Sequence, residues 1–403
     1  MKSPLPAGVP GKTDLRKIIH FDLDAFFCAV EELGDPTLVG KAFAVGGRPE
    51  GRGVVASCSY AARQLGVRSA MPMARALRLC PDLLVVVPSH HQYGEYSHQV
   101  MERLNNVSPL VEQISIDEAF LDVSDMPQAG ESIARELQAT IRAELGLPCS
   151  LGVAANKLVA KIATDLGKAA QKKGLPPNAI TVVPPGGEAA FLAPLPVRML
   201  WGIGPKTADR LEEHRILTIG DLARCPEHTL VELFGKSKDE MVARARGIDD
   251  SPVVTSHVAK SISQEVTFAR DVSDGDVLRR TLRNLSDGVG RQLRADQQYG
   301  CTVRLKLRWA DFTTITRQVT LASPTDSDKE IFQSAMDLFE KAWKPGRLVR
   351  LIGVGVTGLG AAVRQLSLWD KDREIDRRLE ATLDTLRARF GKNVVKRASQ
   401  IKK

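Results

Sequence analysis

The chain has 403 residues, a hydrophobic content of 43% and a formal net charge of +8. This length predicts roughly two to four domains, and the hydrophobic content excludes an intrinsically disordered chain. The sequence has no apolar run of about 18 residues, and its six cysteines lack CxxC or His-paired spacing, which argues against a membrane span, a disulfide framework and a zinc site. A soluble protein of the reducing cytoplasm is expected. The basic excess fits a polyanionic partner, most often a nucleic acid.

The first half of the chain alternates short strands with helices. Residues 1–16 contain several Pro and Gly and are expected to form a flexible N-terminal extension. Asp24 is well placed to cap the first helix. In chain order we expect a strand over 17–24, a helix to Leu33, strands over 41–46 and 53–58, helices over 60–65 and 73–79, a strand over 83–87, a hairpin over 111–123, a helix over 130–146, a strand over 149–153 and a helix over 157–166. This mixture of antiparallel strands and crossing helices is typical of an α+β fold.

The second half divides into smaller units. A loop rich in Lys, Gly and Pro over 171–177 precedes a helical unit over 188–247, and a short linker follows it. Residues 261–359 predict a separate α+β module with two amphipathic helices. The last stretch, 362–403, predicts a polar helix with a basic tail.

Three carboxylates carry the main chemical signal: Asp22 ends the first apolar run, and the adjacent pair Asp117 and Glu118 lies at the tip of the hairpin. Neighbouring carboxylates repel one another unless a cation screens them. Mg²⁺ prefers hard oxygen ligands, so the set indicates two-metal phosphoryl or nucleotidyl transfer. The alternative is that these acids are ordinary solvated turn residues beside buried strands.

Gly202-Ile-Gly204-Pro205-Lys206 predicts a tight hairpin that leads into a helix. Backbone N–H groups at such a helix start, with Lys206 nearby, can bind a DNA phosphate without reading sequence. The alternative is a plain helix–turn–helix packing unit.

Two further patterns lie in the last module. Alternation over 301–309 places Arg304, Lys306 and Arg308 on one face of a strand, where they suit salt-dependent contact with DNA or, alternatively, form a solvated face. The segment 365–369 contains apolar residues in a polar region, which suits a docking peptide or packing against the module itself.

Four motifs, in order, resemble the Y-family DNA polymerases of the bacterial DinB type, and the resemblance runs from about residue 17 to 370. The motifs lie at 21–27, 59–72, 115–122 and 202–204. The resemblance implies an α+β, multidomain right-hand architecture with a ferredoxin-like palm. The implied divisions are a palm over 17–33 and 85–187, fingers over 34–84, a helix-hairpin-helix thumb over 188–247, a linker over 248–257, an α+β little finger over 258–360, and a clamp-binding motif with a C-terminal tail over 361–403.

The resemblance also implies roles for individual residues. Asp22, Asp117 and Glu118, with the backbone carbonyl of Leu23, would bind two Mg²⁺ ions, with Mn²⁺ as a substitute. Phe27 would be a steric gate that excludes the ribose hydroxyl. The implied nucleotide contacts are Phe26, Phe27, Ser57, Tyr60, Arg63 and Lys168; the DNA contacts are Gly202, Gly204, Lys206, Arg304, Lys306 and Arg308; and the contacts with a sliding clamp are Gln365, Leu366, Leu368 and Trp369. The residues after Lys168 depart from the family motif, so Lys172 or Lys173 could share its role.

The implied activity is low-fidelity translesion synthesis on primer–template DNA with dNTPs, by a monomer without a proofreading domain. A non-catalytic DNA-binding scaffold is a rival, although such a protein has no reason to keep Asp22, Asp117, Glu118 and Phe27. A palm-fold nucleotide cyclase is a second rival, but it needs neither the DNA-binding hairpin nor the basic strand.

Overall fold

The computed structural model describes residues 16–170, 174–361, 371–391 and 394–395. Its contacts divide the chain into two compact units, residues 1–49 with 53–257, and residues 50–52 with 258–403. Within these described ranges, no helix is long and apolar enough to cross a membrane. All six cysteines are free, as the sequence predicted.

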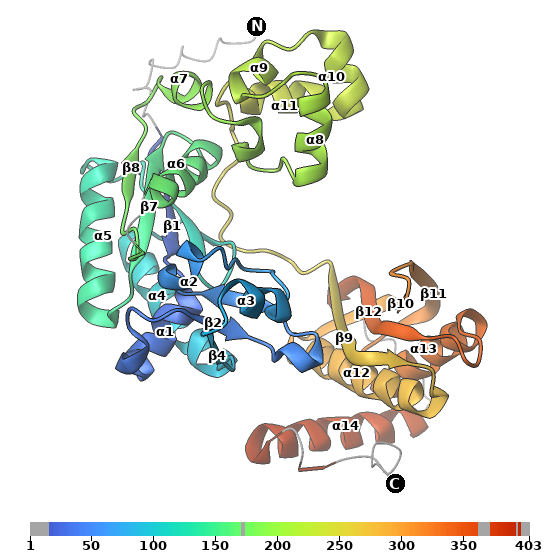
Figure 1. The fold of residues 1–403 in the computed structure, drawn as a ribbon. Coiled ribbons are helices and arrows are strands. Elements are labelled where there is room, and N and C mark those ends of the chain that lie inside the picture. Colours follow the sequence, from blue (N-terminus) through green and yellow to red (C-terminus); the bar gives the residue numbers. More distant parts are fainter. Residues whose placement is uncertain (1–15, 171–173, 362–370, 392–393, 396–403) are drawn as a thin grey trace, which may run out of the picture. The chain divides into compact units, whose positions relative to one another are not determined.

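A five-stranded sheet, in the order β5-β6-β1-β7-β8, forms the centre of the first unit (Figure 1). Its strands are β1 (Ile18–Leu23), β5 (Val111–Gln113), β6 (Glu118–Asp122), β7 (Cys149–Ala154) and β8 (Ile180–Val182). The central strand β1 is antiparallel to both β6 and β7, and His20 pairs with Phe120 on one side and Gly152 on the other. Because directly paired residues point to the same face, these three side chain positions share one face of the sheet.

Helices cover both faces of this sheet. On one face, apolar residues of β1 such as Phe21 form a core with the helices α1 (Phe26–Gly34), α4 (His90–Val107) and α5 (Gly130–Leu145). On the other face lies α6 (Lys157–Ala170), which approaches β7 so closely that a Cβ at Gly152 would meet the carbonyl oxygen of Ala160. Asp22 and Glu118, two of the carboxylates predicted for catalysis, therefore share their face of the sheet with α6.

The helix α4 and the strand β8 were not predicted from the sequence. The buried stripe of α4 is short and includes Tyr93, Val100 and Leu104, whereas the rest of the helix is mostly polar. The helix was therefore hard to predict, because so few apolar residues give only a weak 3.6-residue periodicity.

The remaining elements of the first unit follow the predicted pattern. A three-stranded sheet, β3-β2-β4, carries two short helices, and a group of five short helices follows. The elements are β2 (Phe43–Gly46), β3 (Val55–Cys58), α2 (Tyr60–Gln64), α3 (Met73–Leu79), β4 (Leu84–Val86), α7 (Glu188–Leu192), α8 (Pro205–Glu213), α9 (Ile219–Ala223), α10 (Glu227–Phe234) and α11 (Lys238–Ala245).

The second unit is a four-stranded antiparallel sheet, ordered β11-β10-β12-β9, with two helices on one face (Figure 1). Its elements are β9 (Ser261–Val272), α12 (Gly275–Ala295), β10 (Gln298–Trp309), β11 (Thr314–Thr325), α13 (Asp328–Ala342), β12 (Val349–Ala361) and α14 (Lys371–Phe390). The predicted alternation of β10 is confirmed, because Val303, Leu305 and Leu307 are buried. The polar C-terminal helix is α14, and Arg294 of α12 forms ion pairs with its Glu380 and Asp384. The segment 365–369, predicted to bind a clamp, lies outside the described residues.

A buried ion pair fastens α6 to the sheet of the first unit. The Nζ of Lys157 lies 2.8 Å from the Oε2 of Glu112, and both side chains are less than 10% exposed. The same Oε2 accepts the backbone N–H of Val254 at 2.9 Å. Removing the Lys157 ammonium leaves the buried Glu112 carboxylate with only the exposed imidazole of His257, 3.5 Å from its Oε1, as a neighbouring basic group, and the loss of one partner of such a pair costs about 3–5 kcal/mol.

We therefore expect Lys157→Met to lower the free energy of unfolding by about 3–5 kcal/mol. Denaturant unfolding of this variant and wild type measures the difference. The double variant Lys157→Met/Glu112→Gln is the control, and it should recover most of the loss because no unpaired charge remains. A single variant as stable as wild type would contradict the expectation.

Candidate active site

The strand register brings two of the predicted carboxylates together. Asp22 on β1 is the direct partner of Glu118 on β6, so their side chains lie next to each other on the face that α6 covers. Asp117 precedes β6, and its carbonyl accepts the backbone N–H of Leu23 at 3.0 Å. The hairpin and β1 thus hold all the predicted acidic ligands at one edge of the sheet.

Two lysines of α6 reach these carboxylates. The Nζ of Lys168 lies 2.6 Å from the Oδ1 of Asp22 and 3.3 Å from the Oδ1 of Asp24. The Nζ of Lys161 lies 2.5 Å from the Oε1 of Glu118. Lys161 and Lys168 are seven residues apart, a spacing that places them on one face of a helix. Lys168, predicted to contact the triphosphate, thus lies beside the acids in this structure, and Lys172 and Lys173 lie outside the described residues.

The two carboxyl groups differ in acidity. Burial would raise the pKa of Glu118, but the hydrogen bonds from His20 and Lys161 outweigh it and lower that pKa to about 2. Burial raises the pKa of Asp22, although the neighbouring Lys168 acts in the opposite direction. Glu118 is thus the more firmly ionised of the pair, because it has two donors on one oxygen.

The prediction that Asp24 caps the first helix was wrong. Its carboxylate is fully buried and accepts hydrogen bonds from the Oγ of Ser150 at 2.9 Å and from the backbone N–H of Asn178 at 3.0 Å. The N-cap residue of α1 is Ala25, which makes no side-chain cap and has a φ of 49°. A buried carboxylate needs donors and a counter-charge, and these come from distant parts of the chain.

The donor set fits a divalent cation in its chemistry, since carboxylate and carbonyl oxygens are the ligands that Mg²⁺ prefers. Among the described residues, however, no three His, Cys, Asp or Glu side chains already converge as a metal cluster. The carboxylate of Asp117 accepts a hydrogen bond from the hydroxyl of Ser115, while Asp22 and Glu118 face lysines. In this structure the ammonium groups of Lys161 and Lys168 therefore each occupy one oxygen of the Glu118 and Asp22 carboxylates.

Phe27 lies on α1, the helix that follows β1 in the chain. It is half-buried, and its ring stacks on that of Tyr93 with centroids 4.1 Å apart and an interplanar angle of 12°. The ring of His90 approaches it edge-on at 6.3 Å. These neighbours hold the exposed part of the Phe27 ring in one orientation.

Tyr60 and Arg63 of α2 form a second polar group. The guanidinium of Arg63 lies over the Tyr60 ring, 4.7 Å from its centroid. Burial, and then the charge of Asp24, raise the pKa of Tyr60, so its hydroxyl remains a donor at neutral pH. That hydroxyl is buried and has no hydrogen-bond partner among the residues that the structure describes, which suits contact with a ligand.

Phe26 and Ser57, also predicted to contact a nucleotide, are buried. Phe26 is 2% exposed and packs near Tyr93, and Ser57 is 7% exposed and accepts a hydrogen bond from the Sγ of Cys28. Neither offers an open surface to a ligand in this structure.

The first predicted DNA-binding segment forms the expected turn before α8. Gly202 has a φ of 99°, Gly204 is the N-cap residue, and Pro205 begins the helix. Lys206 is exposed. The glycine at 202 is required because side chains rarely adopt this backbone conformation.

The second predicted DNA-binding surface is the outer face of β10. Arg304 and Lys306 pair there with Gly355 and Gly353 of β12, and a shallow pocket of about 300 Å³ lies over these positions. The ammonium of Lys306 lies 2.7 Å from Glu265, whereas Arg304 and Arg308 contact only neutral side chains in the described contacts. The two arginines therefore supply most of the uncompensated charge.

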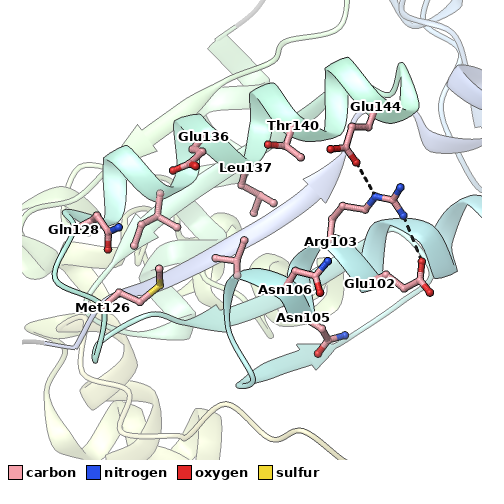
Figure 2. A pocket seen from close by; sticks show the side chains of 12 residues that line it. Glu102, Arg103, Asn105, Asn106, Met126, Gln128, Glu136, Leu137, Thr140 and Glu144 are labelled. Carbon is pink, nitrogen blue, oxygen red and sulfur yellow. Dashed lines mark hydrogen bonds and ion pairs between the residues drawn. The ribbon is translucent and has the colours of Figure 1, made fainter.

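A larger groove, of about 820 Å³, lies in the first unit between α4 and α5, on the face of the five-stranded sheet opposite α6 (Figure 2). Figure 2 shows Arg103 between Glu102 and Glu144, with which it forms ion pairs. Glu136 also lines the groove. Its acidic lining suits neither a nucleotide nor a phosphate backbone, so the groove is not the candidate site.

Comparison with known proteins identifies the class. The impB/mucB/samB family model matches residues 21–165, the C-terminal domain model of that family matches residues 259–368, and the IMS family HHH motif matches residues 185–215. Among solved structures, the Y-family DNA polymerase chimera Dbh-Dpo4(243-245)-Dbh is similar with a TM-score of 0.75 and 25% identity, covering 86% of this chain and 100% of its own. The chain therefore belongs to the impB/mucB/samB family, whose fold is that of the Y-family DNA polymerases.

Individual relatives agree with this assignment. The DNA polymerase IV of Desulfatibacillum aliphaticivorans is 41% identical over 391 residues, covering 95% of this chain and 96% of the relative. The DNA polymerase IV of Streptomyces coelicolor is 42% identical and covers 85% of this chain and 71% of the relative. The predicted resemblance and right-hand, α+β fold are thus confirmed, and the chain belongs among the DNA-directed DNA polymerases.

Proposed function

We propose that this chain extends primed DNA by template-directed nucleotidyl transfer at Asp22, Asp117 and Glu118, and does so in translesion synthesis. The observation that carries the proposal is the pairing of Asp22 with Glu118 on neighbouring strands, with Lys168 in contact with Asp22. Family membership supports the reaction class. The proposed divisions of the chain remain the palm, fingers, thumb and little finger predicted from the sequence.

Each residue near the acids has a proposed task. Asp22, Asp117, Glu118 and the carbonyl of Leu23 would hold two Mg²⁺ ions. When bound, such ions lower the pKa of the primer hydroxyl and stabilise the charge that develops on the triphosphate. Lys168 would move from Asp22 to the triphosphate, where Tyr60 and Arg63 add donors. The Phe27 ring would occupy the space that a ribose 2′-hydroxyl requires.

The proposal extends to partners and setting. Primer–template DNA would bind through the turn before α8 and through the basic face of β10. A sliding clamp would bind residues 365–369 and hold the enzyme near the primer end. The enzyme would act as a cytoplasmic monomer without proofreading, and Mn²⁺ would replace Mg²⁺.

Extension of a labelled primer on a template, with dNTPs and Mg²⁺, tests the proposal. We expect stepwise extension by the wild-type chain. Binding of primed DNA without extension under any metal or salt condition would favour the scaffold, and no salt-sensitive DNA binding at all would favour a cyclase-like enzyme.

Salt dependence tests the basic face of β10. The double variant Arg304→Ala/Arg308→Ala should bind primed DNA more weakly and lower the slope of log Kd against log salt by about 2, since each lost phosphate contact removes about 1. Fluorescence anisotropy over a range of salt concentrations measures this slope. Arg279→Ala is the control, because Arg279 lies on α12, which packs on the other face of this sheet, and pairs with Asp276. An unchanged slope would remove this face from the proposed DNA contacts.

Deleting residues 365–369 tests the clamp assignment. Tethering raises the effective concentration at the primer and can increase apparent affinity by about 10²-fold or more. We expect the deletion to remove the stimulation by a loaded sliding clamp and to leave synthesis without the clamp unchanged. Primer extension with and without the clamp measures both quantities, and the substitution Leu368→Ala/Trp369→Ala should repeat the result. Equal loss of both activities would show that the segment supports the fold instead.

A further inference from the structure

One buried titratable residue of the active-site face has no task in the proposed mechanism. His20 on β1 is fully buried, and both of its ring nitrogens are engaged. Its Nε2 lies 2.7 Å from the Oε1 of Glu118, and its Nδ1 lies 2.9 Å from the Oγ1 of Thr164 on α6. His20 thus links the catalytic edge of the sheet to the helix behind it.

The packing around His20 fixes its ring. Phe120, the partner of His20 on β6, places its ring 4.8 Å from the imidazole at a tilt of 58°. Gly152, the partner on β7, has no side chain, and a Cβ there would lie 2.7 Å from the Oγ1 of Thr164. The glycine therefore allows α6 to bring Thr164 within reach of the ring.

The bonding pattern gives a direction to the hydrogen bonds. An ionised carboxylate can only accept, so the hydrogen between Glu118 and His20 belongs to Nε2. The hydroxyl of Thr164 lies within hydrogen-bond distance of Nδ1 and also of the carbonyl oxygens of Ala160, at 3.2 Å, and of His20, at 3.4 Å. Thr164, His20 and Glu118 thus form one chain of hydrogen bonds.

The two donors on the Oε1 of Glu118 differ in how firmly they are held. Lys161 brings an ammonium group, which repels a divalent cation, on a long side chain that is 16% exposed, whereas the His20 ring is fully buried and has a partner on each nitrogen. A cation arriving at Glu118 would therefore displace Lys161 and leave the bond from His20 in place. Hydrogen-bonded partners of this kind orient ligands, and their loss typically costs about 10-fold to 100-fold in metal affinity or activity.

We infer that His20, oriented by Thr164, is a positioning residue that holds the Glu118 carboxylate for a divalent cation. This rests on the proposed function, because it assigns Glu118 as a ligand. His20 itself touches neither cation nor substrate. Its role is to keep one rotamer of Glu118, so that binding does not have to order the side chain.

A pair of substitutions separates positioning from packing. His20→Gln keeps an amide N–H that can reach Glu118, whereas His20→Leu fills the buried space without any donor. A positioning role predicts that the Leu variant is the poorer enzyme and the Gln variant the better one. A packing role predicts the opposite order, since a buried amide costs more than a buried aliphatic group. Thr164→Val should have a smaller effect than His20→Leu, and Thr164→Ser should match wild type because it keeps the hydroxyl.

Two readouts decide the matter. Electron paramagnetic resonance titration of Mn²⁺ with each variant, in the presence of primed DNA and a non-hydrolysable dNTP, should show about 10-fold weaker binding for His20→Leu and near-normal binding for His20→Gln. The Mg²⁺ concentration for half-maximal extension should shift in the same order, while KM for dNTP at saturating Mg²⁺ changes little. Wild-type Mn²⁺ binding by His20→Leu, or losses that follow thermal stability, would overturn the inference. If the Mn²⁺ affinity falls across the variants in the predicted order but the wild-type chain never extends a primer, the proposed function fails and the positioning role stands.

Discussion

Glu118→Gln is expected to reduce the rate of single-nucleotide incorporation by about 10³-fold or more, while binding of primed DNA stays at the wild-type level. Loss of a residue that hydrogen-bonds to a metal ligand typically lowers metal affinity or activity by about 10-fold to 100-fold, and loss of the charge of the ligand itself should lower activity further. Glutamine keeps the size of the side chain and one oxygen, so it can still accept from His20 and Lys161. The variant therefore isolates the negative charge that these two donors keep on Glu118 despite its burial.

Rapid-quench kinetics on a primer–template measures the rate, and anisotropy measures DNA binding. Glu136→Gln is the matched control, because Glu136 lines the groove between α4 and α5 on the other side of the sheet. It should behave as wild type in both assays. Wild-type incorporation by Glu118→Gln would remove the carboxylate from the mechanism.

Phe27→Ala is expected to raise the use of ribonucleotides relative to deoxynucleotides by about 10-fold to 100-fold. A 2′-hydroxyl forced against a fixed ring resembles an overpacked core, for which the cost is about 1–3 kcal/mol. Each 1.4 kcal/mol corresponds to about a factor of ten. The cost applies here because Phe27 stacks flat on Tyr93 and cannot easily swing away.

The ratio of kcat/KM for a dNTP and the matching rNTP measures this selection. Phe27→Tyr is the control, since it keeps the ring and should keep the discrimination. Selection that survives in Phe27→Ala would mean that another group excludes the ribose, and Phe27 would then be only a packing residue on α1.

The sequence was sufficient for the acidic edge of the sheet because local patterns encode it. One apolar run ends at Asp22, and Glu118 lies at the tip of the predicted hairpin, so both residues were expected at strand ends. The strand register shows that they are direct neighbours on β1 and β6. Lys161 was missed, although its spacing from Lys168 on one helix could have identified it. Buried strands were predicted on both sides of Asp117 and Glu118: Phe120, after the pair, is fully buried, whereas Ile114 and Ile116, before it, are 40% and 37% exposed.

Other features depend on contacts between distant segments. Asp24 resembles a helix cap in the sequence, and only the approach of Ser150 and Asn178 makes it a buried acceptor. The bond between His20 and Thr164 likewise depends on the close approach of α6 over Gly152, residues that no local periodicity connects. Such residues require the packed structure for their recognition.

Template dependence tests the central claim most directly. The measurement uses purified wild-type protein and a primer annealed in turn to four templates, each with a different base at the next position. Each dNTP is supplied alone with Mg²⁺. A Y-family polymerase with this site should add mainly the complementary nucleotide in each case, with a clear background of wrong insertions. Addition that ignores the template base, or no addition by the intact protein, would contradict the account.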